Sequence, residues 1–141
     1  MKIYFVRHGL VNYDTQQLSS EGKQFAAKLA VLIQEKIDYI ACDKEQRCKD
    51  TIQSFSIRKG IRPNYFDKSE FTTKKPLAAC PEQGVSVICY RIEAVNHLFA
   101  ELNIPLFTDL NRDTAYEKII VLELDGAKRT LSHINTGYRK L

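Results

Sequence analysis

The sequence lacks tryptophan, has a single methionine, and places none of its four cysteines in a CxxC pair; these are Cys42, Cys48, Cys80 and Cys89. Without that spacing, and without histidines at zinc-ligand intervals, the cysteines indicate neither a structural zinc site nor a disulfide framework. We therefore expect reduced, mostly buried thiols. We also expect no metal centre and no other cofactor.

Long apolar runs are also missing. Lys, Asp or Glu interrupts every apolar stretch well short of the roughly 20 residues that span a bilayer. The N-terminus alternates like a strand and does not have the apolar core of a signal peptide. This pattern predicts a cytoplasmic protein that does not associate with a membrane.

The chain has no run of basic residues, although its net charge is +4. Its lysines and arginines are scattered and are not interleaved with aromatic residues, whereas nucleic-acid interfaces gather positive charge in one patch. The sequence thus argues against a nucleic-acid partner. The 141 residues, 44% of them hydrophobic and 27% charged, are typical of one globular domain over residues 1–141.

Strand and helix patterns alternate along the chain. Continuous apolar runs rich in β-branched and aromatic residues predict strands buried on both faces, at 2–6, 37–41 and 85–89. Apolar residues at i, i+4, i+7 and i+8 predict helices between and after these strands. One expected helix begins at Ser19-Ser20. A second runs from 44 to 57, and a third includes residues 95–102.

The other segments complete the predicted topology. Glycines and prolines make residues 59–84 mostly loop, with a possible short strand at 64–66. Two β-rich runs flank Asp125-Gly126, which is a strong hairpin signal. Strands that alternate with helices require crossover connections. We therefore predict a three-layer α/β/α fold with a central, mostly parallel sheet and a C-terminal hairpin.

The triplet Arg7-His8-Gly9 directly follows the first predicted strand. Ligands of such sheets bind beyond the carboxyl ends of the strands, so this position favours a functional role. An imidazole can attack a phosphoryl group, a guanidinium can neutralise its oxygens, and glycine permits close backbone approach. The alternative is a solvated loop with a surface histidine, because a tripeptide alone is a weak pattern.

Further motifs give the chain a resemblance to the histidine phosphatase (phosphoglycerate mutase-like) superfamily. They are VRHG after the first strand, LSSEG at a helix start, and DYIACDKEQRCKDT over residues 38–51. In the last motif, Arg47 stands at the place of the family's second arginine and Thr51 at that of its threonine. The short chain, together with Asp14, is most similar to the small phosphohistidine-phosphatase branch.

This resemblance implies a set of site residues. His8 would be transiently phosphorylated, and Arg7 and Arg47 would clamp the phosphate. Gly9 would adjoin the phosphate, and Asp14 would place a negative charge near it. The resemblance also implies the fold predicted above.

The family completes its pocket with a second histidine after the fourth strand, and here the sequence departs from the family. That place is taken by Tyr90 or, in an alignment shifted by one residue, by Arg91. Tyrosine could donate a hydrogen bond without charge, whereas arginine could supply both charge and donors. Because one preorganised donor is typically worth about 10²–10³ in rate, the replacement predicts weakened turnover.

Many members of the family also carry a carboxylic acid in the loop before that strand. Glu70 is the candidate general acid here, with Glu82 as a competitor. The alternative for Glu70 is an exposed loop carboxylate without a catalytic role. His97 and His133 are predicted to be structural or surface residues.

Two functions follow from the motifs. The first is hydrolysis of a phosphomonoester or of phosphohistidine through a phosphohistidine intermediate on His8. The second is a catalytically degenerate family member that binds phosphate or a phosphorylated partner without turnover. In either case the partner is a phosphorylated small molecule or a phosphorylated protein. A true mutase is disfavoured, because it would need longer loops to reorient its substrate.

Overall fold

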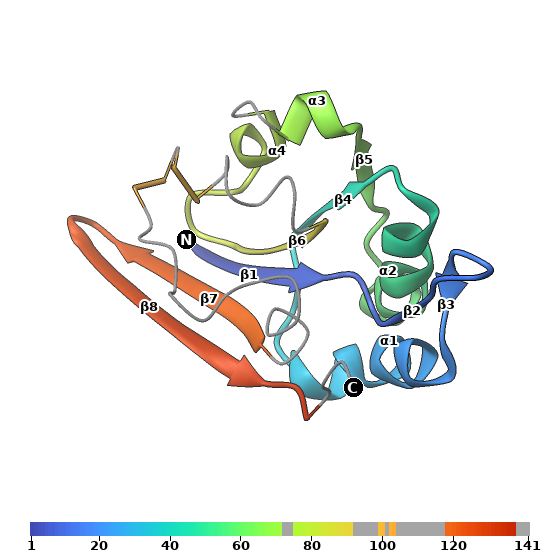
Figure 1. Ribbon diagram of the computed structural model, residues 1–141. Coiled ribbons are helices and arrows are strands. Elements are labelled where there is room, and N and C mark those ends of the chain that lie inside the picture. The colour runs from blue at the N-terminus through green and yellow to red at the C-terminus, as the bar shows by residue number, and fades with distance from the viewer. Residues whose placement is uncertain (72–74, 92–98, 101, 104–117, 138–141) are drawn as a thin grey trace.

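A single six-stranded sheet forms the centre of the computed structural model, which describes residues 1–71, 75–91, 99–100, 102–103 and 118–137. The strand order is β5-β4-β6-β1-β7-β8 (Figure 1). The strands are β1 (Lys2–Arg7), β4 (Tyr39–Asp43), β5 (Asn64–Phe66), β6 (Val85–Tyr90), β7 (Lys118–Asp125) and β8 (Lys128–Asn135). Strands β5, β4, β6 and β1 run parallel to one another. Strand β7 pairs antiparallel with β1, and β8 pairs antiparallel with β7. The predicted mostly parallel sheet with a C-terminal hairpin is confirmed.

Helices cover both faces of this sheet (Figure 1). On one face, α1 (Ser20–Leu32) and α2 (Gln46–Lys59) pack on alternate strand residues such as Tyr4 and Val6. On the other, α3 (Lys68–Phe71), α4 (Lys75–Ala78) and the buried Phe99 lie over the intervening residues, which include Phe5. Because side chains of a strand alternate between faces, β1 contributes to both cores. The three layers predicted from the sequence are therefore present.

The start of α1 matches the sequence pattern closely. Ser19 is the N-cap, and its hydroxyl accepts a hydrogen bond from the Gly22 N–H at 3.1 Å. The predicted apolar stripe is buried at Phe25, Leu29 and Ile33. Capping and periodicity thus agree on both the beginning and the orientation of this helix.

Other predicted boundaries differ from the structure. Strand β4 begins at Tyr39, two residues later than expected, and the short ladder of β2 (Val11–Asn12) with β3 (Gln17–Leu18) had no clear signal. Within the predicted loop 59–84, α3 and α4 form in addition to the expected strand β5. These helices have only four residues each, too few to show an apolar period.

Three further expectations concern the remaining residues. The four cysteines are unpaired and buried, as predicted. Of the helix expected to include 95–102, Phe99 and Ala100 are helical and Phe99 is buried. The rest of that helix, including His97, lies outside the described residues apart from Leu102. No helix in the described part of the chain is both long and apolar enough to cross a bilayer.

A polar network ties the beginning of β1 to the segment after α1. Lys2 Nζ lies 2.7 Å from Glu35 Oε1, and the Tyr4 hydroxyl donates to the same carboxylate. Lys59 of α2 donates to the main-chain oxygen of Glu35 at 3.0 Å. Burial raises the pKa of the Glu35 carboxyl, but the hydrogen bonds from Lys2 and Tyr4 lower it by more, so the pKa lies below its ordinary value.

We predict that Glu35→Gln lowers the melting temperature at pH 7. The folded-state pKa is depressed, so the ionised carboxylate stabilises the fold above its unfolded pKa of about 4.3, and this stabilisation is lost as the pH falls through the folded value. Thermal denaturation at pH 7 and pH 3 should therefore show a gap between wild type and variant that narrows in acid. The exposed Glu82→Gln is the control and should show no gap. A gap of constant size would contradict the expected role of Glu35.

Candidate active site

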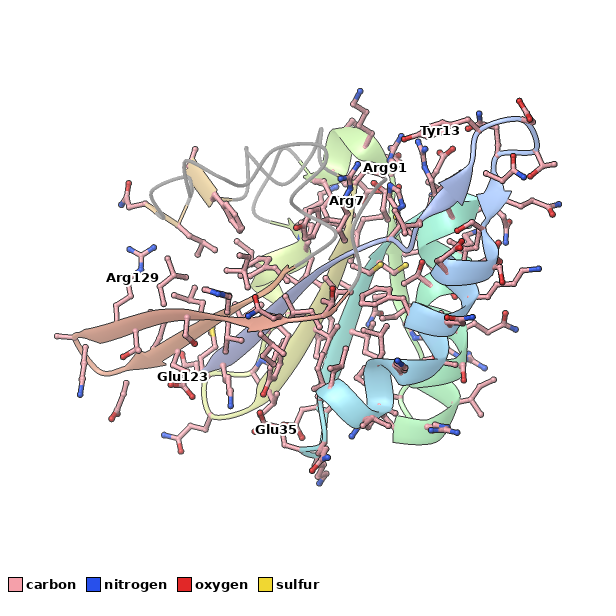
Figure 2. The ribbon with its side chains drawn as sticks, turned by 60° about the horizontal axis from the view of Figure 1, so that its bottom comes forward. Arg7, Tyr13, Glu35, Arg91, Glu123 and Arg129 are labelled. Carbon is pink, nitrogen blue, oxygen red and sulfur yellow. The ribbon has the colours of Figure 1, made fainter. Side chains whose placement is uncertain are left out.

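The motif residues meet at the carboxyl edge of the parallel strands. Arg7, the last residue of β1, pairs in register with Tyr90, the last residue of β6. Figure 2 shows Arg7 and Arg91 at this end of the sheet, whereas Glu35 and Glu123 lie at the opposite end. The RHG triplet thus lies at the carboxyl end of the first strand, with Arg7 still in β1 and with His8 and Gly9 directly after it.

His8 is buried, with 3% of its surface exposed, and its ring orientation is set by the backbone. The main-chain N–H of His8 donates to the Tyr90 carbonyl at 3.2 Å, and ring Nδ1 lies 2.8 Å from the Gly9 carbonyl oxygen. A carbonyl oxygen only accepts hydrogen bonds, so Nδ1 carries the proton of the neutral ring. The lone pair is consequently on Nε2, which is the nitrogen able to act as a nucleophile.

Gly9 allows the loop after β1 to touch the first turn of α1. A Cβ on Gly9 would lie 2.8 Å from the main-chain oxygen of Gly22, and a Cβ on Gly22 would lie 2.1 Å from that of Leu10. The Ser19 hydroxyl donates to the Leu10 oxygen at 3.1 Å. Both glycines in the RHG and LSSEG motifs are therefore required by the close approach of two backbones.

Thr51 joins this loop to α2, where Arg47 lies in the first turn. The Gly9 N–H donates to Thr51 Oγ1 at 2.8 Å, and the same hydroxyl donates to the Arg47 carbonyl at 2.7 Å. Thr51 is fully buried. This hydroxyl therefore couples the position of His8 to the helix turn that carries the second arginine. Arg47 Nε is buried and has no acceptor among the described residues.

Tyr90 occupies the register position beside Arg7, and its side chain belongs to the core under α3 and α4. It is fully buried, and its hydroxyl has no hydrogen-bond partner in the part of the chain that the structure describes. Burial raises the pKa of Tyr90, although the nearby charge of Arg7 lowers it. The phenol therefore stays protonated and remains an uncharged donor. Buried donors without partners are rare, so this one is a notable feature of the site.

Arg91, the other candidate for the place of the second histidine, is held by carboxylates. Its Nε donates to Asp43 Oδ2 at 2.9 Å, and its Nη1 lies 3.6 Å from Glu45 Oε2. Burial lowers the pKa of Arg91, but the hydrogen bond and charge of Asp43 raise it by more. The guanidinium is thus fully charged. Asp43 was missed in the sequence analysis, and its only signal there is a carboxylate at the end of a buried strand.

Asp14 lies on the surface, in the turn between β2 and β3. Its N–H donates to Asn12 Oδ1 at 3.0 Å, within the turn itself. Figure 2 shows the neighbouring Tyr13 at the same end of the molecule as Arg7 and Arg91. Asp14 is therefore not among the buried groups that line this edge of the sheet.

The two candidate acids have different surroundings. Glu70 Oε1 accepts the Asp67 N–H at 3.1 Å, and Asp67 Oδ1 accepts the Glu70 N–H at 3.0 Å, which is a capping box at the start of α3. The other carboxylate oxygen of Glu70, Oε2, lies 3.9 Å from Lys75 Nζ. Glu82 is exposed and precedes β6, so it lies at the opposite edge of the sheet from His8. The position of Glu82 excludes it from this site.

We predict that Thr51→Val destabilises the protein by about 1–3 kcal/mol, because the buried Gly9 N–H would lose its acceptor. Urea denaturation measures the free energy of unfolding. Thr51→Ser keeps the hydroxyl and is expected to cost less than about 1 kcal/mol, the value of one buried methyl group. Equal losses in the two variants would show that packing of the methyl group, and not the hydrogen bond, is what matters.

No protein-family model matches this chain, and a search of curated proteins finds no match either. Solved structures do match it. A phosphoserine phosphatase from Entamoeba histolytica in complex with 3-phosphoglyceric acid is similar with a TM-score of 0.68 and 13% identity, over 95% of this chain and 96% of that chain. A mycobacterial glucosyl-3-phosphoglycerate phosphatase in complex with VO3 has a TM-score of 0.68 and 14% identity, over 95% and 98%.

The protein histidine phosphatase SixA in complex with tungstate is also similar, with a TM-score of 0.61 and 15% identity, over 96% of this chain and 97% of that chain. Similarity at this level of identity establishes a shared architecture. The resemblance predicted from the RHG, LSSEG and Arg47 motifs is confirmed at the level of the fold. The chain has the phosphoglycerate mutase-like α/β fold of the histidine phosphatases.

Proposed function

We propose that this protein is a phosphatase that hydrolyses a phosphomonoester or phosphohistidine through a phosphohistidine on His8. The observation that carries the proposal is the state of the His8 ring. Its Nδ1 lies 2.8 Å from the Gly9 carbonyl, so the lone pair is on Nε2. Arg7 directly precedes this residue, and Thr51 links its loop to Arg47. An imidazole nucleophile with guanidinium clamps is a sufficient minimal site for phosphoryl transfer.

The first step transfers the phosphoryl group to the enzyme. Arg7 and Arg47 bind the non-bridging oxygens and neutralise their charge. The Nε2 lone pair of His8 attacks phosphorus as the bond to the leaving oxygen or nitrogen breaks. The electron pair of that bond stays on the leaving atom. Gly9 keeps Nδ1 protonated, so the phosphorylated ring is an imidazolium and a good leaving group for the second step.

The second step releases phosphate. A water oxygen attacks phosphorus while the P–N bond breaks, and its electron pair returns to Nε2. The water gives up a proton to solvent, and the products are inorganic phosphate and the original neutral ring. The Tyr90 hydroxyl, buried and protonated, can donate to a phosphoryl oxygen in both steps. It supplies no positive charge, so turnover is expected to be slow.

The leaving group needs a proton, and Glu70 as its source stays a prediction. Both Glu70 oxygens have structural contacts, one in the capping box of α3 and one near Lys75. Phosphohistidine makes the smallest demand on such a donor. With its other ring nitrogen protonated, the leaving imidazole departs as a neutral molecule, whereas a phosphomonoester must release an alkoxide. The contacts of Glu70 therefore favour phosphohistidine within the proposed substrate class.

The similar structures support this reading of the site. They are phosphatases, and their complexes hold 3-phosphoglyceric acid, VO3 or tungstate. The proposed partners are a phosphorylated small molecule or a phosphorylated protein. We place the protein in the cytoplasm, where buried unpaired cysteines such as those seen here are the rule.

The absence of charge at Tyr90 favours a second function, which is binding of phosphate or a phosphorylated partner without turnover. Arginine clamps and a neutral phenol donor would suffice for binding. Transition-state stabilisation depends more strongly than ground-state binding on charge placed where it develops. Activity measurements on variants of His8 and Tyr90 separate the two functions.

We predict that His8→Ala lowers phosphatase activity by about a thousandfold or more, because it removes the nucleophile. Release of phosphate from a phosphohistidine peptide and from an aryl phosphate, between pH 5 and 8, is the measurement. His133→Ala removes an exposed histidine on β8 and is the matched control, expected to retain wild-type activity. Activity that survives in His8→Ala would rule out the proposed intermediate.

We predict that Tyr90→His raises the turnover number by about 10- to 100-fold, because it introduces a donor that can carry charge. Tyr90→Phe, which keeps the ring and loses the hydroxyl, should reduce activity below that of wild type. An inactive wild type that gains activity in Tyr90→His would establish the binding function. A wild type that neither turns over substrate nor gains stability from inorganic phosphate would contradict both functions.

A further inference from the structure

Asp43 has no part in the mechanism described above, yet it is the most deeply buried carboxylate at the proposed site. It ends β4, and Arg91 follows β6, so the two residues reach the same edge from neighbouring parallel strands. Their side chains are 1% and 15% exposed. A charge pair so well shielded from solvent interacts more strongly than one on the surface.

Both oxygens of Asp43 are engaged, so its carboxylate has a fixed orientation. Oδ1 accepts the N–H of Glu45, the N-cap residue of α2, at 2.9 Å. Oδ2 accepts Nε–H of Arg91, also at 2.9 Å. The backbone of α2 thus orients the carboxylate, and the carboxylate in turn orients the guanidinium.

The guanidinium of Arg91 presents a defined set of donors as a result. Its Nε is bonded to Asp43, and its Nη1 lies 3.6 Å from Glu45 Oε2. Among the described residues, no acceptor contacts Nη2. Figure 2 shows Arg91 at the same end of the sheet as Arg7. Asp43 stabilises the charged guanidinium of Arg91, because an opposite charge within hydrogen-bond distance favours the charged form.

We propose that Asp43 positions Arg91 so that its Nη2 donors complete the phosphate site, and that this pair supplies the charge of the missing second histidine. The inference rests on the proposed function, since it adds a ligand to the same anion site. Arg91 is the group that contacts the phosphoryl oxygens, and Asp43 is a positioning residue that acts through Arg91. Tyr90 remains the neutral donor beside them.

The alternative role of Asp43 is to compete with the anion for Arg91, and this role changes anion affinity in the opposite direction. A carboxylate that only competed with the anion for Arg91 would weaken anion binding, and its removal would tighten it. A carboxylate that positions Arg91 strengthens binding, and its removal weakens it. The sign of the change therefore decides between the two roles.

Titration calorimetry with tungstate, a tetrahedral oxyanion, tests the proposal. In Asp43→Asn the amide oxygen can still accept the Glu45 N–H, but the charge that holds Arg91 is lost. We expect binding to weaken by about tenfold, the value of a charge-assisted hydrogen bond. Glu45→Gln removes the same charge from the exposed side of Arg91 and is expected to change affinity less than about twofold.

A double-mutant cycle adds a measurement that a merely structural role would not affect. Arg91→Gln should weaken tungstate binding by about tenfold as well, and adding Asp43→Asn to it should cause no further loss. Circular dichroism and melting temperature confirm the fold of each variant. If Asp43→Asn does not fold, Arg91→Lys, which keeps the charge but not the planar fork, should bind as weakly as Arg91→Gln.

The outcomes distinguish this inference from the proposed function. A wild type that does not bind tungstate contradicts the anion site itself. A wild type that binds tungstate, with Asp43→Asn equally tight or tighter, contradicts only the positioning role of Asp43. Independent, additive losses in the double-mutant cycle contradict it too, as does wild-type affinity in Arg91→Lys.

Discussion

The hydrogen bond from the Gly9 N–H to Thr51 Oγ1 is the contact on which the arrangement of the site depends. It joins the loop after β1 to α2, and through the Thr51 hydroxyl it reaches the carbonyl of Arg47. The contact is possible because Gly9 and Gly22 have no side chains where the loop meets α1. His8, which follows β1, and Arg47, in the first turn of α2, are thereby held in one relative position. Rigid support of this kind is what phosphoryl transfer requires, because positioning supplies most of its catalysis.

Charged side chains are arranged differently at the two ends of the parallel strands. At the amino edge, Lys2 lies between Glu35 and Glu123, so cation and carboxylates compensate one another. At the carboxyl edge, Arg91 contacts the buried carboxylate of Asp43 and the exposed Glu45. The neighbouring Arg7 is buried, so positive charge there is partly removed from water. Anions gain more from such a site than from scattered surface lysines, since solvent screens the latter.

The sequence patterns predicted the fold, and they named most of the residues that the structure brings to the carboxyl edge of the sheet. Continuous apolar runs predicted β1, β4 and β6, because strands covered on both faces need apolar side chains in both directions. Apolar periodicity did not predict four-residue helices such as α3, because this period does not appear over a single turn. The polar capping box of Asp67 and Glu70 was the available signal for α3. This capping box gives Glu70 a structural role at the position where the resemblance predicts a general acid.

Amino-acid sequence alone determined the layered α/β architecture and the place of His8 beyond the first strand, because both follow from the local order of apolar runs and helix starts. Only the tertiary structure decided where Tyr90 and Arg91, the two candidates for the place of the family's second histidine, direct their side chains. Tyr90 lies in register with Arg7 inside the core, and Arg91 turns to Asp43 on the neighbouring strand. Such pairings join residues far apart in the chain, and they depend on the order of strands in the sheet, which no local pattern encodes.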